Sequence, residues 1–131
     1  MNKKIFIIED DINSCSALTA KFNIFGFKVV SFVDRQILVI TNKIKSYQPN
    51  LIILDLILSS VDSLELLSAL RADEQLVKIP IFIYSEQKTV EEKERAINLG
   101  AEQFFDKNKF TLDEFVERAV RIIKNKEKII N

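Results

Sequence analysis

Four short apolar segments of the chain are each followed by a side chain that could take part in ionic chemistry. These segments and the residues that follow them are Ile5–Ile8 with Glu9-Asp10, Leu51–Leu54 with Asp55, Ile81–Tyr84 with Ser85, and Gln103–Phe105 with Asp106-Lys107. Apolar runs this short, bounded by Pro, Asn or charged residues, are typical of buried strands. Open α/β sheets bind their ligands where the carboxyl ends of parallel strands meet. The pattern therefore predicts carboxylates, a hydroxyl and an ammonium group at one sheet edge.

Carboxylates crowded at such an edge repel one another unless a cation joins them. Mg2+ prefers oxygen ligands and often combines one or two carboxylates with water and phosphoryl oxygens, so Glu9, Asp10 and Asp55 are candidate metal ligands. Lys107 would add a positive charge, and Ser85 a hydroxyl that can donate to an anionic oxygen. This set suits transfer of a phosphoryl group to a carboxylate. Asp55 is the candidate nucleophile, because its strand is expected between the acidic pair and the strands of Ser85 and Lys107.

The elements that must position these side chains alternate between strand and helix along the whole chain, which is typical of a parallel sheet covered by helices. A further strand is expected at 27–32, and helices at 12–25, 34–47, about 62–71, 89–99 and from 111 to about 123, the last three beginning at capping-box pairs. We predict one (βα)5 domain over residues 1–131, a flavodoxin-like doubly wound parallel sheet with strand order 2-1-3-4-5. Residues 124–131 are expected to form a frayed helix end or tail.

The amino-acid composition argues against several classes of function. The 131 residues suffice for one domain, and nineteen basic residues balance nineteen acidic ones, which argues against a nucleic-acid or anionic membrane surface. The chain has no histidine, which excludes histidine acid–base catalysis and phosphohistidine chemistry within it. Cys15 is the single cysteine and cannot form an intrachain disulfide. No signal peptide or membrane span is evident, so a cytoplasmic protein is expected.

Several sequence motifs carry a resemblance to a known family. They are Ile7-Ile8-Glu9-Asp10-Asp11, Pro49-Asn50-Leu51-Ile52-Ile53-Leu54-Asp55-Leu56, Ile81 to Ser85, and Gly100-Ala101-Glu102-Gln103-Phe104-Phe105-Asp106-Lys107. In this order and at these spacings they resemble a response regulator receiver domain of two-component signal transduction, over essentially the whole chain. The resemblance implies a phosphoacceptor domain that switches a partner and turns over no external substrate.

The resemblance also implies roles for the residues at the sheet edge. Asp55 would accept a phosphoryl group from a histidine kinase or histidine phosphotransfer protein. Mg2+ would be bound by Asp10, Asp55 and the backbone carbonyl of Ile57, with Glu9 acting through water.

Further roles follow for the residues that would respond to phosphorylation. Ser85 and Lys107 would hold the phosphoryl oxygens, and Phe104 would be the aromatic switch residue. A downstream protein would bind the face formed by the fourth helix, fifth strand and fifth helix. Homodimer formation on phosphorylation stays open.

Two other functions remain as alternatives. Asn108 stands where the family commonly has proline, and Glu86 where a small residue is usual, so the fold could serve as an interaction module with weak switching. Ser59 and Ser63 also replace a frequent proline and glycine in the loop after Asp55. A phosphatase with an aspartyl-phosphate intermediate is less favoured, because Ile57 occupies the position where such enzymes commonly have a second aspartate.

Overall fold

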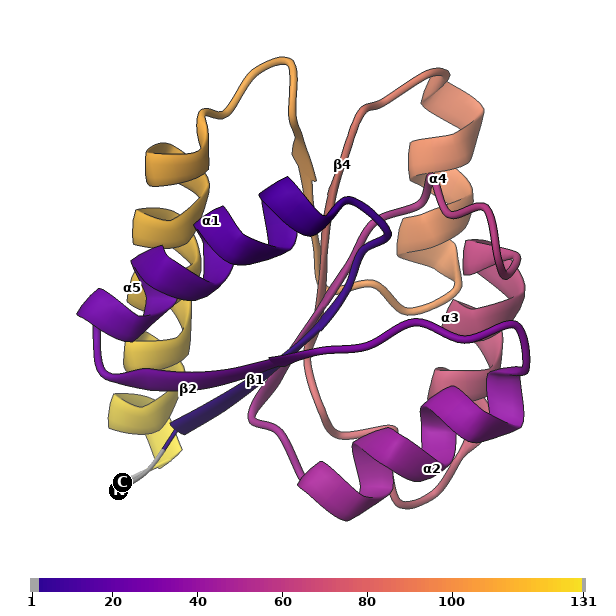
Figure 1. Cartoon of the computed structure of the whole chain (residues 1–131), viewed down its shortest axis with the longest axis horizontal. Helices are drawn as coiled ribbons and strands as arrows, with labels where there is room; N and C mark the ends of the chain where they lie inside the picture. Colours follow the sequence, from indigo (N-terminus) through magenta and orange to yellow (C-terminus); the bar gives the residue numbers. More distant parts are fainter. Residues whose placement is uncertain (1–2, 131) are drawn as a thin grey trace.

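The structure of the protein, a computed structural model, describes the backbone of residues 3–130 and the side chains of residues 3–127. Figure 1 shows strands in the middle of the molecule with helices on both sides. The elements in chain order are β1 (Lys3–Ile8), α1 (Ile12–Ile24), β2 (Phe27–Ser31), α2 (Ile37–Tyr47), β3 (Leu51–Leu54), α3 (Ser63–Ala72), β4 (Ile81–Ser85), α4 (Val90–Asn98), β5 (Gln103–Asp106) and α5 (Leu112–Ile130).

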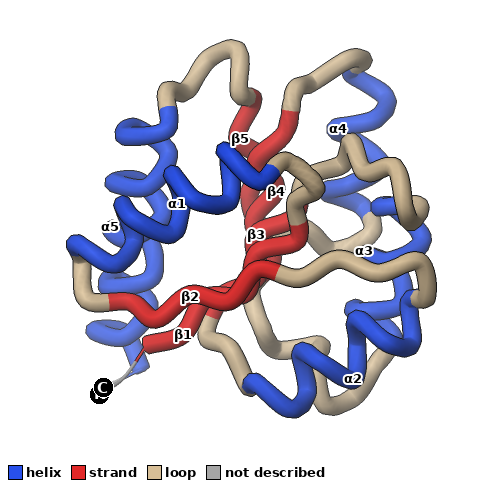
Figure 2. The backbone as a smooth tube through the Cα atoms, viewed as in Figure 1, coloured by secondary structure: helices blue, strands red, loops and turns tan. Residues whose placement is uncertain are grey.

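The strands form one parallel sheet in the order β2-β1-β3-β4-β5, which confirms the predicted fold class and strand order. Helices α1 and α5 cover one face of the sheet, and α2, α3 and α4 cover the other (Figures 1 and 2). The chain can therefore bury both faces of the central strands, and this explains why β3 is apolar at every position.

Each face of the sheet has its own apolar core. Side chains of β3 alternate between the two cores: Leu51 and Ile53 face α1 and α5, whereas Ile52 and Leu54 face α2, α3 and α4. Because consecutive strand residues point to opposite faces, both cores fix the register of β3. This leaves Asp55, the next residue, at the carboxyl edge of the sheet.

The predicted start of one helix is wrong. Helix α2 begins at Ile37, three residues after its predicted start at Asp34. The carboxylate of Asp34 instead accepts a 2.9 Å hydrogen bond from the backbone N–H of Gln36, which forms a local turn before the helix. Strand β2 ends at Ser31, one residue earlier than predicted. Neither difference moves a residue of the predicted site.

The predicted side-chain caps form at the starts of α3, α4 and α5, but among the described residues the reciprocal bond of the capping box is found only at α5. Thr111 and Glu114 form a reciprocal capping box at the start of α5: Glu114 N donates to Thr111 Oγ1 at 3.2 Å, and Thr111 N donates to Glu114 Oε1 at 2.9 Å. Gly26 follows α1 with a φ of 88°, a conformation that glycine adopts without strain. Helix α5 is described as far as Ile130, through most of the segment predicted to fray, and residue 131 lies outside the described residues.

None of the helices in the described part of the chain is long and apolar enough to span a membrane.

Candidate functional site

The carboxyl edge of the sheet brings together side chains from four strand ends. Glu9 follows β1, Asp55 follows β3, Ser85 ends β4 and Lys107 follows β5. Strand β3 lies between β1 and β4, so Asp55 is in the middle of the set (Figure 2). Parallel register aligns these ends, since Ile8 pairs with Leu54.

Lys107 joins two buried carboxylates. Its Nζ atom lies 2.8 Å from Glu9 Oε1 and 2.8 Å from Asp55 Oδ2. Glu9 is 8% exposed and Asp55 6%. The ammonium also lies 5.4 Å from the centre of the Tyr84 ring, whose hydroxyl donates to the carbonyl of Phe110 at 3.0 Å. Lys107 is thus held at the site by opposite charges and by an aromatic wall.

The other carboxylate oxygen of Asp55 has donors of its own. Ser85, which is fully buried, donates from Oγ to Asp55 Oδ1 at 2.8 Å and accepts from the backbone N–H of Leu56 at 3.1 Å. The backbone N–H of Ile57 also donates to Asp55 Oδ1, at 2.7 Å. Asp55 therefore caps the turn that follows β3 and also contacts the serine and the lysine. The structure thus shows the turn-capping contact of Asp55, and its role as a phosphoacceptor stays a prediction.

The electrostatics of the site favour a charged lysine more than a charged Glu9. Burial raises the pKa of Glu9, as does the nearby carboxylate of Asp55, while Lys107 acts in the opposite direction. Burial alone would lower the pKa of Lys107, but the hydrogen bonds and charges of Asp55 and Glu9 outweigh it, and the net pKa is raised. One ammonium shared by two buried carboxylates produces both effects.

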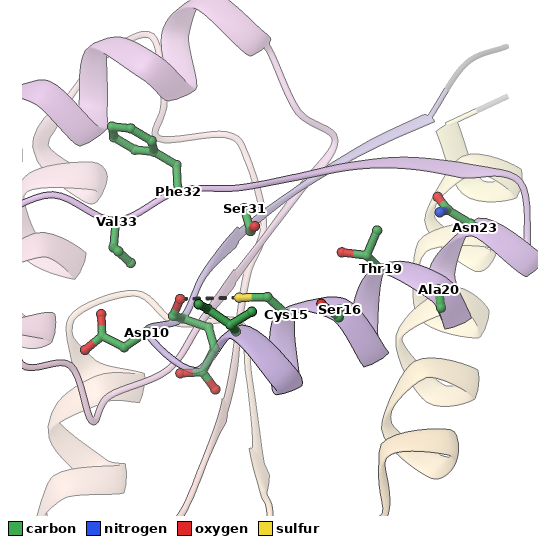
Figure 3. A pocket seen from close by; sticks show the side chains of 11 residues that line it. Asp10, Cys15, Ser16, Thr19, Ala20, Asn23, Ser31, Phe32 and Val33 are labelled. Atoms are coloured by element: carbon green, nitrogen blue, oxygen red, sulfur yellow. Dashed lines mark hydrogen bonds between the residues drawn. The ribbon is translucent and has the colours of Figure 1, made fainter.

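The carboxylate of Asp10 has different hydrogen-bond partners from that of Glu9. Its Oδ2 atom accepts hydrogen bonds from the backbone N–H of Ser59 at 2.6 Å and from the Ser59 hydroxyl at 2.9 Å. Figure 3 shows the carboxylate of Asp10 turned away from the helix that carries Cys15 and Thr19. Across residues 3–127, no three carboxylate, thiol or imidazole side chains gather closely enough to hold a metal ion. The structure thus brings together Glu9, Asp55 and Lys107, whereas Asp10, which follows β1, contacts the loop after β3 through Ser59.

Comparison with known proteins now identifies the family. The sequence model of the response regulator receiver domain matches residues 5–120. The chain belongs to this family. It is therefore a receiver domain of two-component response regulators, a class of domains that act with histidine kinases and downstream effectors and are not in general enzymes that turn over a substrate.

Individual relatives support this assignment. The chain is 27% identical over 129 residues to the DNA-binding dual master transcriptional regulator RpaA of Synechocystis, an alignment that covers 96% of this chain and 51% of RpaA. A response regulator structure from Chloroflexus aurantiacus superposes with a TM-score of 0.81 at 21% identity, covering 95% of this chain and 99% of that one. The Mn2+-bound response regulator Rcp1 superposes with a TM-score of 0.74 at 20% identity, covering 87% and 88%.

The receiver domain spans about half the length of the curated relatives that it matches. The functions of the remaining half belong to those relatives and are not assigned to this chain.

A groove beside the site leads to the acidic pair of the receiver domain. It has a volume of 630 Å³, and helix α1 and the segment after β2 line it together with Glu9 and Asp10 (Figure 3). Cys15 lies in this groove, and its thiol donates to the backbone carbonyl of Glu9 at 3.3 Å. Burial raises the pKa of the Cys15 thiol, which disfavours the reactive thiolate form.

Phe104, the predicted switch residue, is half-buried in the receiver domain. Its ring packs against the apolar core under α3 and α4, and Lys93 Nζ of α4 lies 5.8 Å from the ring centre. The Phe104 ring therefore connects β5 to α4, two elements of the face that is predicted to change on phosphorylation. This contact does not test the switching role of Phe104, which stays a prediction.

Two polar residues near the site were not predicted to act there. Ser59 was noted only as a substitute for proline, yet it holds Asp10. Asp106 is buried, and its Oδ1 atom accepts from the backbone N–H groups of Gln87 and Asn108, at 3.2 and 2.9 Å, so that it joins the loops after β4 and β5. For Asp106 the available signal was its type, because aspartate commonly accepts a hydrogen bond from the residue two positions on.

Proposed function

We propose that this receiver domain accepts a phosphoryl group on Asp55 from a phosphohistidine of a histidine kinase or histidine phosphotransfer protein. The observation that carries the proposal is the position of Asp55, which lies between the ammonium of Lys107 and the hydroxyl of Ser85. The donor histidine lies outside these 131 residues, because they contain none. The groove lined by α1, Glu9 and Asp10 lies beside this edge of the sheet, and such a partner would dock there.

The transfer forms one bond and breaks another. A carboxylate oxygen of Asp55 attacks phosphorus, the new O–P bond forms, and the P–N bond to the donor imidazole breaks with its electron pair passing to that nitrogen. Among the described residues, the donor to Asp55 Oδ2 is the flexible side chain of Lys107 alone. The lysine can follow the transferred group and bind its oxygens, while Ile57 N keeps Oδ1 in place.

The residue types that Mg2+ prefers follow β1 and β3, although their carboxylates do not gather into a three-residue cluster among the described residues. Glu9, Asp10, Asp55 and the backbone carbonyl of Ile57 would hold the ion, and their carboxylate and carbonyl oxygens fit its chemistry. When bound, Mg2+ supplies positive charge that balances the phosphoryl oxygens. Asp10 Oδ2 already accepts two hydrogen bonds from Ser59, so an ion that binds this oxygen must first displace them.

Phosphorylation would act through Ser85 and Phe104. A phosphoryl group on Asp55 offers new acceptors to the Ser85 hydroxyl, and Ser85 lies at the start of the loop that leads to α4. A shift of this loop changes the support of the Phe104 ring, and with it the face formed by α4, β5 and α5. The phosphoryl group shifts the population only as far as it binds the active arrangement better than the inactive one. A downstream protein or a second copy of the chain would bind this face.

Intact-mass measurement tests the acceptor. Incubation with a phosphodonor and Mg2+ should add one phosphoryl group to the wild type and none to Asp55→Asn. Asp62→Asn is the matched control: it lies on the same loop and caps α3, and asparagine caps a helix about as well as aspartate. Equal modification of Asp55→Asn and the wild type would reject Asp55 as the acceptor.

A second candidate function is a receiver-fold interaction module that switches weakly. One observation favours it: Ser85 Oγ is held by both Asp55 Oδ1 and the backbone N–H of Leu56, and both bonds must break before the serine can move. Exposed Glu86 adds a negative charge next to the site. For such a module, Mg2+ and a phosphoryl mimic would leave the amide NMR signals around Phe104 unchanged, whereas a switch would move them.

A further inference from the structure

The Ser59–Asp10 contact connects two segments that are 49 positions apart in the sequence. Asp10 follows β1 directly, and Ser59 lies in the middle of the loop between β3 and α3. Both donors of Ser59, its backbone N–H and its hydroxyl, point to the same oxygen, Asp10 Oδ2. Hydrogen bonds to an ionised carboxylate are shorter and stronger than those between neutral groups.

The loop that Ser59 belongs to has few other polar anchors among the described residues. Near its start, Ile57 N donates to Asp55 Oδ1, and at its end the Ser63 hydroxyl donates to the backbone carbonyl of Asp55 at 3.0 Å. Between these ends, Ser60 Oγ is buried without a hydrogen-bond partner in the described part of the chain. Ser59 is therefore the residue that fastens the middle of the loop, and it does so to a predicted metal ligand.

We propose that Ser59 is a positioning residue that competes with a divalent cation for the carboxylate of Asp10. An ion that uses Asp10 Oδ2 must displace two hydrogen bonds, so Ser59 lowers the affinity of the site for Mg2+. The same exchange releases the middle of the β3–α3 loop. Near its start, this loop also carries the backbone carbonyl of Ile57, a predicted metal ligand. Metal occupancy and loop mobility are thereby coupled. This inference rests on the proposed function for the identity of the ion.

Proline at position 59 has neither donor, because it lacks both the hydroxyl and the backbone N–H. The backbone N–H of Ser59 donates to Asp10, so its removal breaks no strand or helix hydrogen bond. Ser59→Pro thus tests the whole contact, and Ser59→Ala tests the hydroxyl alone. Ser60→Ala is the matched control, since it removes a neighbouring hydroxyl that has no partner in the described residues.

The experiment is a Mg2+ titration of the full chain, followed by amide NMR, for the wild type and the three variants. We expect Ser59→Pro to bind Mg2+ about tenfold more tightly, which corresponds to about 1.4 kcal/mol. Ser59→Ala should bind about threefold more tightly, and Ser60→Ala should match the wild type. In the wild type, Mg2+ should also move the amide signal of Ser59 and speed its hydrogen exchange.

Unchanged or weaker Mg2+ binding by Ser59→Pro would overturn the proposal, because the contact would then support the metal site or be irrelevant to it. An equal gain in Ser60→Ala would overturn it too, since the effect would belong to the loop in general. If Ser59→Pro does not fold, Ser59→Ala decides the question by the same criteria.

Phosphorylation is measured separately on the same samples by intact mass. Tighter Mg2+ binding without any modification of Asp55 would reject the proposed function and keep the role of Ser59. Modification of Asp55 with identical Mg2+ affinities in all variants would keep the proposed function and reject the role of Ser59.

Discussion

Ser85 Oγ donates a 2.8 Å hydrogen bond to Asp55 Oδ1, and this contact joins the end of β4 to the end of β3 at the centre of the site. The same serine oxygen accepts from the backbone N–H of Leu56. Ser85 thus has two functions in one atom: it holds the candidate phosphoacceptor, and it satisfies a backbone donor at the start of the next loop. A switch that moves Ser85 must replace both bonds.

Ser85→Ala should destabilise the fold. The substitution removes the donor to Asp55 and leaves the partly buried N–H of Leu56 without its acceptor, which costs about 1–3 kcal/mol. Urea unfolding followed by circular dichroism measures this loss. Ser68→Ala, at an exposed position of α3, is the control and should change the free energy of unfolding by less than about 0.5 kcal/mol. Equal stability of the two variants would contradict the dual role of Ser85.

Lys107→Ala should also lower stability at neutral pH. It leaves Glu9 and Asp55 without the cation that they share, and buried charges without a partner are costly. Because the Lys107 side chain is 28% exposed, solvent reduces the penalty to roughly 1–3 kcal/mol. Thermal unfolding of Lys107→Ala and of the exposed control Lys109→Ala gives the comparison. In a double-mutant cycle, adding Glu9→Gln to Lys107→Ala should recover part of the loss, and strict additivity would disprove the coupling.

Glu9 should make stability depend on pH in a specific direction. Its pKa is raised in the folded state, so the folded protein binds this proton more tightly than the unfolded chain does. The contribution of Glu9 to stability is therefore fully present below the unfolded pKa, near 4.5, and is lost as the pH rises through the folded value. Glu9→Gln should then be more stable than the wild type at pH 7, with the difference vanishing below about pH 4.5. Urea unfolding at several pH values measures it, and a wild type that is the more stable protein at pH 7 would contradict this sign.

Ile57→Asn should shorten the lifetime of phosphorylated Asp55, if the proposed function holds. Ile57 is 42% exposed and lies two positions after the acceptor, where water would approach the phosphoryl group. An isoleucine cannot orient that water and an asparagine can, so the decay should become about two- to tenfold faster. Intact mass against time after removal of the donor measures the decay. Val77→Asn is a matched control, because Val77 is 41% exposed and lies beyond α3. An unchanged decay rate in Ile57→Asn would place this residue outside the path of water.

Much of the fold could be predicted because its signals are local. The apolar run Leu51–Leu54 indicates a strand buried on both faces, and the structure shows alternate residues of this strand in two separate cores. The Thr111 and Glu114 pair marks a helix start by residues that are neighbours in sequence. The start of α2 was missed because Asp34 forms a competing turn, and sequence alone does not show which hydrogen bond forms.

The sequence alone determined which chemical groups reach the edge of the sheet, since each candidate residue follows a strand and strand ends in a parallel sheet meet. Only the tertiary structure decided which of these groups touch. Lys107 and Glu9 are 98 positions apart, and their contact depends on the order in which β1, β3, β4 and β5 pair. Asp10 follows the same strand as Glu9 yet bonds to Ser59, because successive residues point in different directions and a backbone N–H on a distant loop lies within reach. Residue types are written in the sequence, whereas the direction of a side chain and its nearest donor are properties of the packed chain.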